Sequence, residues 1–235
     1  MTFPPSGPQV REPLNAEAIA ACAVSLADAG GLETVSMRRI ADSLGVSAMA
    51  LYRHVESREA LLLAMASRVG RRSALLPEPP ATWQEMLRHL ALAQWDSFTR
   101  HPWLLQIVLG PSRLLDMAPT SGLEQLLRAL HDAGLAEDEC FDSVMGVSAA
   151  VIGASSLALA ANPGPGRHHP TRPNAVVPLD AGDGAPAGTL AARFRERGIT
   201  IDASRQSLDF AVDTILRGLQ ARISDNVRTQ HPTSG

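Results

Sequence analysis

The side chains best suited to chemistry lie between Ser36 and Val55, where arginine and hydroxyl groups alternate with small apolar residues. Ser36 and Ser47 each stand where a helix can begin, because a serine there accepts hydrogen bonds from free backbone N–H groups. Gly45 suits the left-handed turn that ends a helix. Two short helices joined by a tight turn form a helix-turn-helix, so this stretch predicts a surface that contacts duplex DNA.

The helix that opens at Ser47 carries the side chains expected to reach the bases. Arg53 is the candidate base contact, because a guanidinium can donate two hydrogen bonds to guanine, worth about 1–3 kcal/mol of discrimination. Met49 and Ala50 are expected against thymine methyl groups. The other residues expected at this surface contact phosphates or stand at the starts of helices: Ser36, Met37, Arg38, Ser47, Ala48, Tyr52, His54 and Arg58. The alternative is that the arginines only keep the helices soluble and that Tyr52 and His54 are packing residues.

Composition limits the class of protein. The 235 residues are 45% hydrophobic, which fits one large or two small folded domains. A net charge of −3 argues against a protein that coats nucleic acid indiscriminately, although the segment 11–72 carries 8 Arg against 7 acidic residues. All basic side chains are arginines, which we attribute to a genome rich in G and C. Cys22 and Cys140 are expected to be reduced core thiols, and that suits the cytoplasm.

Apolar residues recur at helical spacing along the chain, and no strand pattern of any length is present, so the fold class is expected to be all-α. A Pro cluster at 77–80 suggests the domain boundary. The expected organisation is a flexible arm (1–13), a helix-turn-helix domain (14–76), a helical domain (80–223) with a mobile loop (162–188), and a disordered tail (224–235). Within the second domain, helices are expected over 83–100, 102–109, 121–133, 137–161, 189–197 and 202–223.

The stretch from Val144 to Ala161 has 18 uncharged residues, close to the lower limit for a membrane span. Its three serines, its small residues and its lack of aromatic or basic flanks favour a buried helix in a soluble protein. The N-terminal segment lacks the apolar core of a signal peptide. Small residues along the same stretch would let a second helix approach closely, so it is a candidate dimer helix, with an intramolecular core helix as the alternative.

Residues 15–72 resemble the DNA-binding domain of the TetR family of transcriptional repressors, whose third helix typically ends in Leu-Tyr-x-His and an apolar residue, here Leu51 to Val55. The remainder resembles the C-terminal domain of the tetracycline-repressor branch. The resemblance implies an all-helical homodimer that binds a palindromic DNA operator and a small-molecule effector. Where that branch has a metal-holding His before a Leu-Gly pair, this chain has Val108, which argues against a metal–tetracycline ligand.

The apolar side chains of the second domain are the expected lining of an effector pocket: Trp83, Met86, Trp95, Phe98, Trp103, Met117, Phe141 and Met145. The alternative is that they are simple core residues. No metal site and no cofactor are expected; His168 and His169 are attributed to a solvated tether. No nucleophile–base pair or phosphate-binding loop indicates an enzyme. The main rival hypothesis is a helical regulator that uses its head on a protein partner and binds DNA weakly.

Overall fold

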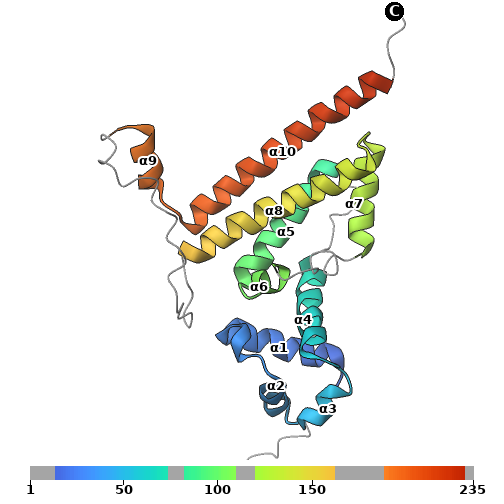
Figure 1. Ribbon diagram of the computed structural model, residues 1–235, viewed down its shortest axis with the longest axis vertical. Coiled ribbons are helices and arrows are strands. Elements are labelled where there is room, and N and C mark those ends of the chain that lie inside the picture. Colours follow the sequence, from blue (N-terminus) through green and yellow to red (C-terminus); the bar gives the residue numbers. More distant parts are fainter. Residues whose placement is uncertain (1–13, 74–81, 110–119, 162–187, 231–235) are drawn as a thin grey trace, which may run out of the picture. The chain divides into compact units, whose positions relative to one another are not determined.

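The computed structural model describes residues 14–73, 82–109, 120–161 and 188–230, and within them the chain is helical with no strand. Contacts divide the chain into two units, residues 1–68 and 69–235. The division falls inside helix α4 (Arg58–Ser73), a few residues before the predicted boundary at the prolines, which lies outside the described residues. The expectation of an all-α fold is confirmed (Figure 1).

The first unit is built from three helices and the beginning of α4. Helix α1 (Ala16–Gly30) begins at Asn15, whose side chain accepts a hydrogen bond from the Ala18 N–H at 2.8 Å. A short 3₁₀ turn η1 (Leu32–Thr34) leads into α2 (Met37–Leu44) and α3 (Ala48–Tyr52). Buried residues from the four α-helices and from the connections beside them form the core of this unit: Ile19, Ala20, Ala23, Ala27, Val35, Ile40, Ala41, Leu51, Val55, Leu61, Met65 and Ala66.

The described residues of the second unit form six further helices. They are α5 (Trp83–Arg100), α6 (Leu104–Val108), α7 (Thr120–Asp132), α8 (Glu137–Ala161), α9 (Leu190–Arg197) and α10 (Ile201–Gln230). Helix α5 begins with a capping box, in which the Thr82 hydroxyl accepts from the Glu85 N–H and the Glu85 carboxylate accepts from the Thr82 N–H. The Glu85 carboxylate accepts hydrogen bonds from the Thr82 N–H at 2.8 Å and from the Thr82 hydroxyl at 2.9 Å, and these two bonds lower the pKa of Glu85.

Helices α8 and α10 run side by side in opposite directions (Figure 1). The start of α8 is joined to the end of α10 by an ion pair between Glu139 and Arg222 and by a hydrogen bond from the Asn226 side chain to the Gly134 carbonyl, 3.1 Å long. The Ala136 N–H and then Arg222 lower the pKa of Glu139. Helix α5 packs against both long helices, so the three form the body of the unit.

Several helix ends differ from the sequence expectation, and α10 and α3 are the clearest cases. Helix α10 continues to Gln230, so most of the stretch expected as a disordered tail is helical. Helix α3 spans only Ala48–Tyr52, with Ser47 and Arg53 as its caps. Local propensity sets helix ends poorly because neighbouring elements stabilise or shorten the last turn.

Helix α8 is long and apolar enough to cross a membrane by length and composition, but only 28% of its most apolar 18-residue window is buried. The expectation of a buried helix is therefore correct for one face only. That face packs on α5, α7 and α10 and includes the buried hydroxyls of Ser143, Ser148 and Ser155.

Candidate nucleic-acid interface and effector core

The turn between α2 and α3 is set by local backbone chemistry. The Ser36 hydroxyl accepts a hydrogen bond from the Arg39 N–H at 3.3 Å, and the Ser47 hydroxyl accepts one from the Ala50 N–H at 3.2 Å. Gly45 adopts φ 67° and ψ 36°, the left-handed conformation that a side chain resists. The Val46 N–H returns to the Ala41 carbonyl at 3.0 Å and completes a Schellman motif. The predicted caps and turn are confirmed.

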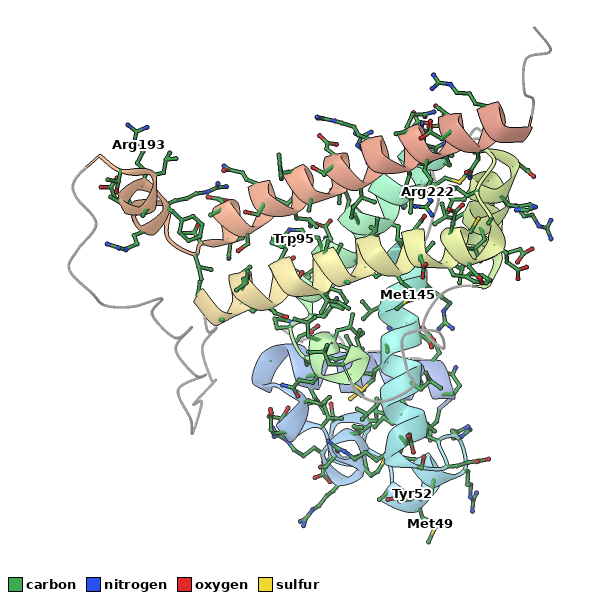
Figure 2. The ribbon with its side chains drawn as sticks, turned by 45° about the horizontal axis from the view of Figure 1, so that its top comes forward. Met49, Tyr52, Trp95, Met145, Arg193 and Arg222 are labelled. Carbon is green, nitrogen blue, oxygen red and sulfur yellow. The ribbon has the colours of Figure 1, made fainter. Side chains whose placement is uncertain are left out.

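Helix α3 has a buried side and an exposed side. Leu51 is 0% exposed and Val55, just after the helix, is 4% exposed. These two residues fix α3 on the rest of the first unit, residues 1–68, which we call the head. On the other side Met49 is 72% exposed and Tyr52 is 49% exposed, and both project outward in Figure 2. Met49 and Tyr52 therefore stand on the side of α3 that is open to contact with another molecule.

The other residues predicted at this surface fall into three groups. Arg38, Arg53 and His54 are exposed, as a contact with DNA requires. Ser36, Met37, Ala48 and Ala50 are partly exposed at the starts of α2 and α3, and Ser47 is exposed. Arg58 is also exposed, but its guanidinium donates hydrogen bonds to the Val35 and Leu32 carbonyls, so the side chain is held against the head.

The predicted effector residues separate in the structure. Trp83, Met86, Trp95, Phe98 and Trp103 are all buried, on α5 or just before α6. Phe141 and Met145 are 45% and 44% exposed on the outer face of α8, so they do not lie with the buried aromatic residues. Met117 lies outside the described residues, as do His168 and His169. The period of a helix does not say which of its faces the core covers, and this explains the misplaced pair.

Buried polar atoms are present on α5 and α8, and one arginine lies near a buried aromatic ring. The Gln94 Nε2 donates to the Ser148 hydroxyl at 3.0 Å across the contact between α5 and α8. The Gln94 Oε1 and the Ser155 Oγ are buried and have no hydrogen-bond partner, and neither does the His89 Nε2. The Arg205 guanidinium lies 6.0 Å from the ring centre of Trp95. Apolar periodicity does not reveal these polar residues; the signal that the sequence offers is Gln94, which interrupts an otherwise apolar face of its helix.

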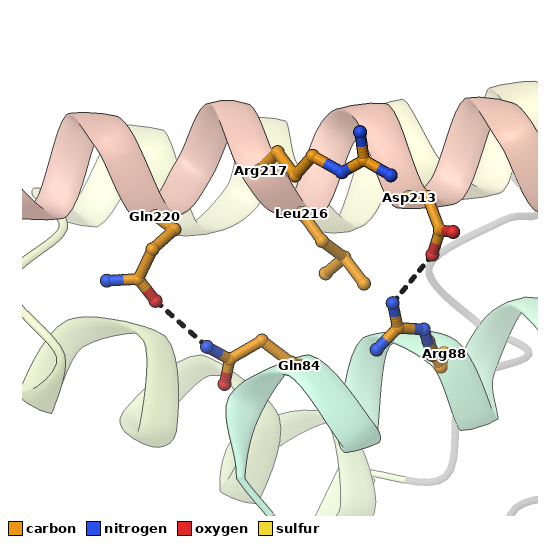
Figure 3. A pocket seen from close by; sticks show the side chains of 6 residues that line it. All are labelled: Gln84, Arg88, Asp213, Leu216, Arg217 and Gln220. Atoms are coloured by element: carbon orange, nitrogen blue, oxygen red, sulfur yellow. Dashed lines mark hydrogen bonds and ion pairs between the residues drawn. The ribbon is translucent and has the colours of Figure 1, made fainter.

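A separate groove lies between α5 and α10 (Figure 3). Its volume is about 220 Å³, and it is lined by Gln84, Arg88, Asp213, Leu216, Arg217 and Gln220. Arg88 and Asp213 form an ion pair of 2.6 Å across it, and the bond from Arg88 lowers the pKa of Asp213. The groove is smaller and more polar than most small-molecule sites, and none of the predicted aromatic residues lines it.

Neither a metal centre nor reactive cysteine chemistry is indicated by the part of the chain that the structure describes. There, no group of three His, Cys, Asp or Glu side chains could hold a metal ion. Cys22 and Cys140 are free thiols, and burial, followed by the charges of Glu139 and Glu137, raises the pKa of Cys140. A raised pKa keeps the thiol protonated and unreactive.

Comparison with known proteins decides the family. The model of bacterial regulatory proteins of the tetR family matches residues 19–65, and the model of the tetracyclin repressor-like C-terminal domain matches residues 76–223. The chain belongs to the tetR family. Proteins of this family are DNA-binding transcription factors and not enzymes. The first match contains α2 and α3 and hence the turn at Gly45.

Individual relatives agree with this assignment. The HTH-type transcriptional repressor DrrR1 of Streptomyces coeruleorubidus is 35% identical over 162 residues, which cover 65% of this chain and 56% of that protein. The class E tetracycline repressor protein of Escherichia coli is 27% identical over 60% of this chain and 67% of that protein. The fold is similar to that of ActR from Streptomyces coelicolor in complex with actinorhodin, with a TM-score of 0.66 and 24% identity over 90% of this chain and 99% of that one.

Proposed function

We propose that this tetR-family chain is a dimeric, cytoplasmic repressor that binds a palindromic DNA operator and releases it when a small, largely apolar effector binds. The observation that carries the proposal is the outer side of α3, where Met49, Tyr52 and Arg53 are exposed while Leu51 and Val55 anchor the helix from beneath. An exposed short helix held rigidly after a tight turn is the arrangement that enters a major groove.

Residues of the proposed interface have separate roles. Arg53 would donate to a guanine, and Met49 and Ala50 would touch thymine methyl groups. Phosphates would be bound by Ser36, Arg38, Tyr52 and His54, with help from the free N–H groups at the start of α2. Met37, Ser47 and Ala48 complete the surface at the helix starts. Phosphate contacts fix the register, and the few base contacts provide the specificity.

The outer faces of α8 and α10 support the proposal that two copies of the chain form a dimer. On α8, Phe141 and Met145 are followed by Gly146, Ala149, Gly153 and Leu157, all exposed. On α10 the exposed face carries Phe210, Thr214, Gly218 and Ala221. A largely uncharged face of this kind on two adjacent helices favours pairing with its own copy in a four-helix arrangement. Two heads are also needed because one head makes too few contacts for tight, specific binding.

The effector site is proposed among the buried aromatic residues of α5 and the start of α6. Trp95, Phe98 and Trp103 offer large apolar contacts, and the unpaired Gln94 Oε1 and Ser155 Oγ offer polar ones. A ligand that presents an aromatic ring system with hydroxyl or carbonyl groups would satisfy both kinds of group. Its binding would lower operator affinity only if it prefers the conformation that binds DNA less well.

The DNA-binding proposal is tested by measuring operator affinity of three proteins by fluorescence anisotropy. The operator is first selected with the wild-type protein from a pool of random duplexes. Arg53→Ala is expected to lose about tenfold or more, because a bidentate contact to guanine is worth about 1–3 kcal/mol. Arg100→Ala removes the same charge from an exposed site on α5 and serves as the matched control.

The outcomes distinguish the proposal from its rival. Loss in Arg53→Ala together with wild-type affinity in Arg100→Ala supports DNA recognition by α3. Equal affinity of all three proteins contradicts it. A wild-type protein that enriches no duplex would favour a regulator that uses this head on a protein partner.

A further inference from the structure

Arg58 is the first residue of α4, and its side chain is used inside the head. Its Nη1 donates to the Val35 carbonyl oxygen at 2.5 Å, and its Nη2 donates to the Leu32 carbonyl oxygen at 3.4 Å. Both carbonyls belong to the connection between α1 and α2, 23 and 26 residues away along the chain. The guanidinium therefore joins the start of α4 to that connection.

The connection is fixed to its neighbours on both sides. The Thr34 hydroxyl donates to the Leu26 carbonyl at 2.9 Å and so holds η1 against the end of α1. Val35 is 1% exposed, and the next residue, Ser36, caps α2. A side chain that binds the Val35 carbonyl consequently acts next to Ser36, the cap of α2.

Helix α3 lies between α2 and α4 in the chain, so its direction depends on how those two helices are joined. At its first end the Gly45 turn connects it to α2. At its other end the buried Val55 and then Arg58 return the chain to the head. The hydrogen bond from Arg58 to the Val35 carbonyl connects the segment that precedes α2 with α4, the helix that follows α3. Helices α2 and α3 are therefore held between two segments that are bonded to each other.

The chemistry of the bond favours arginine over any other residue. A planar guanidinium presents two nitrogens in a fork and can donate to two carbonyl oxygens at once, whereas an ammonium is a single point of charge. Both terminal nitrogens of Arg58 already donate to carbonyl oxygens of the head. These two bonds fix where the guanidinium lies, so a DNA phosphate would have to come to the N–H groups that they leave over.

We propose that Arg58 is a positioning residue for DNA recognition: it fixes the direction of α3 by tying α4 to the connection between α1 and α2, and it is not a phosphate contact. The inference rests on the proposed function, since it assumes that α3 binds DNA. It also revises the role that the sequence predicts for this arginine.

The test uses the dependence of DNA affinity on salt, which counts phosphate contacts. Each phosphate contact contributes about 0.9 to the slope of log affinity against log salt for duplex DNA. Wild type, Arg58→Lys, Arg58→Gln and the comparison variant Arg38→Ala are titrated with the selected operator and with an unrelated duplex of equal length. Titrations cover several salt concentrations, at a temperature where circular dichroism shows each variant folded.

We expect both Arg58 variants to lose about tenfold in affinity for the operator and to keep nearly the wild-type affinity for the unrelated duplex. The slope of log affinity against log salt should stay at its wild-type value. Arg58→Lys is decisive because it keeps the charge and loses the fork. The comparison Arg38→Ala is expected to lose affinity for both duplexes, with a slope reduced by about 0.9.

Three results would overturn the proposal. They are a slope reduced by about 0.9 with equal losses on both duplexes in Arg58→Gln, wild-type behaviour of Arg58→Lys, or no loss in either variant. If the proposed function itself is wrong, the wild-type protein enriches no duplex from the random pool. That result is distinct from any result obtained with the Arg58 variants. If Arg58→Gln does not fold, Arg58→Lys alone gives the same decision.

Discussion

Three glycines on the outer faces of α8 and α10 provide a test of dimerisation. Replacing them by alanine should stabilise the protein if these faces are in water and weaken association if a second copy packs on them. Gly146, Gly153 and Gly218 all lie inside helices, where glycine is about 0.8–1.0 kcal/mol less favourable than alanine. Apart from its chain neighbours and the nearby backbone of its own helix, a Cβ atom added at any of the three meets no atom of the described residues within 4 Å. Nothing in the described part of one copy therefore requires glycine at these three positions.

The expected magnitude follows from these two facts. If the faces were exposed to water, replacing all three glycines by alanine would raise the free energy of unfolding by about 2.4–3 kcal/mol per chain. If a second copy packs there, each new methyl group meets a partner helix, and overpacking typically costs about 1–3 kcal/mol per site. The triple variant should then lose dimer stability, even though each isolated helix becomes more stable.

The assay combines sedimentation equilibrium with urea unfolding at several protein concentrations. The wild-type midpoint should rise with concentration, since association stabilises the folded chain. The triple alanine variant should associate more weakly, and its midpoint should depend less on concentration. A variant that gains about 2–3 kcal/mol and associates as before would refute the assignment of these faces to the dimer.

Three further predictions follow. Gly45→Ala should lower the free energy of unfolding by about 1–2 kcal/mol in urea titrations, because alanine resists φ 67°; an unchanged value would contradict the strained turn. Ser155→Ala removes a buried hydroxyl without a hydrogen-bond partner and should raise the free energy of unfolding, measured by thermal denaturation, by about 1 kcal/mol. The control on the same helix is Ser143→Ala, which loses a 2.6 Å hydrogen bond to the Glu139 carbonyl and should therefore gain less stability. Equal effects of the two substitutions would contradict this reasoning. The pKa of Glu139 is lower in the folded chain than its ordinary value of 4.5, so the ionised carboxylate stabilises the fold above pH 4.5 and this stabilisation is lost as the pH falls through the folded-state pKa. Acid titration should therefore destabilise the wild type more than Glu139→Gln. Parallel stability curves of the two proteins would exclude the effect.

The parts of the fold that follow from local chemistry are predictable from sequence. A serine cap needs only the backbone N–H groups two or three residues ahead, and a left-handed glycine needs only its own missing Cβ. Ser36, Gly45 and Ser47 could therefore be assigned before any tertiary contact was known. Helical periodicity similarly identified the long apolar stretches that became α5, α8 and α10.

The side of each helix that another element covers is not a local property. Phe141 and Met145 share the apolar character of Trp95 and Phe98, yet the first pair is exposed and the second pair is buried. The difference arises because Trp95 and Phe98 lie on the covered face of α5, whereas Phe141 and Met145 lie on the open face of α8. The same holds for Gln94, whose partner Ser148 lies 54 residues away.

The sequence by itself determined the helix-turn-helix, its caps and the family, because these depend on residues a few positions apart and on a short, specific motif. Only the tertiary structure decided that Arg58 binds the carbonyls of Leu32 and Val35 and that α8 keeps an apolar face open. Hydrogen bonds and burial between distant segments depend on how the chain brings those segments together in space, and that information is absent from local spacing.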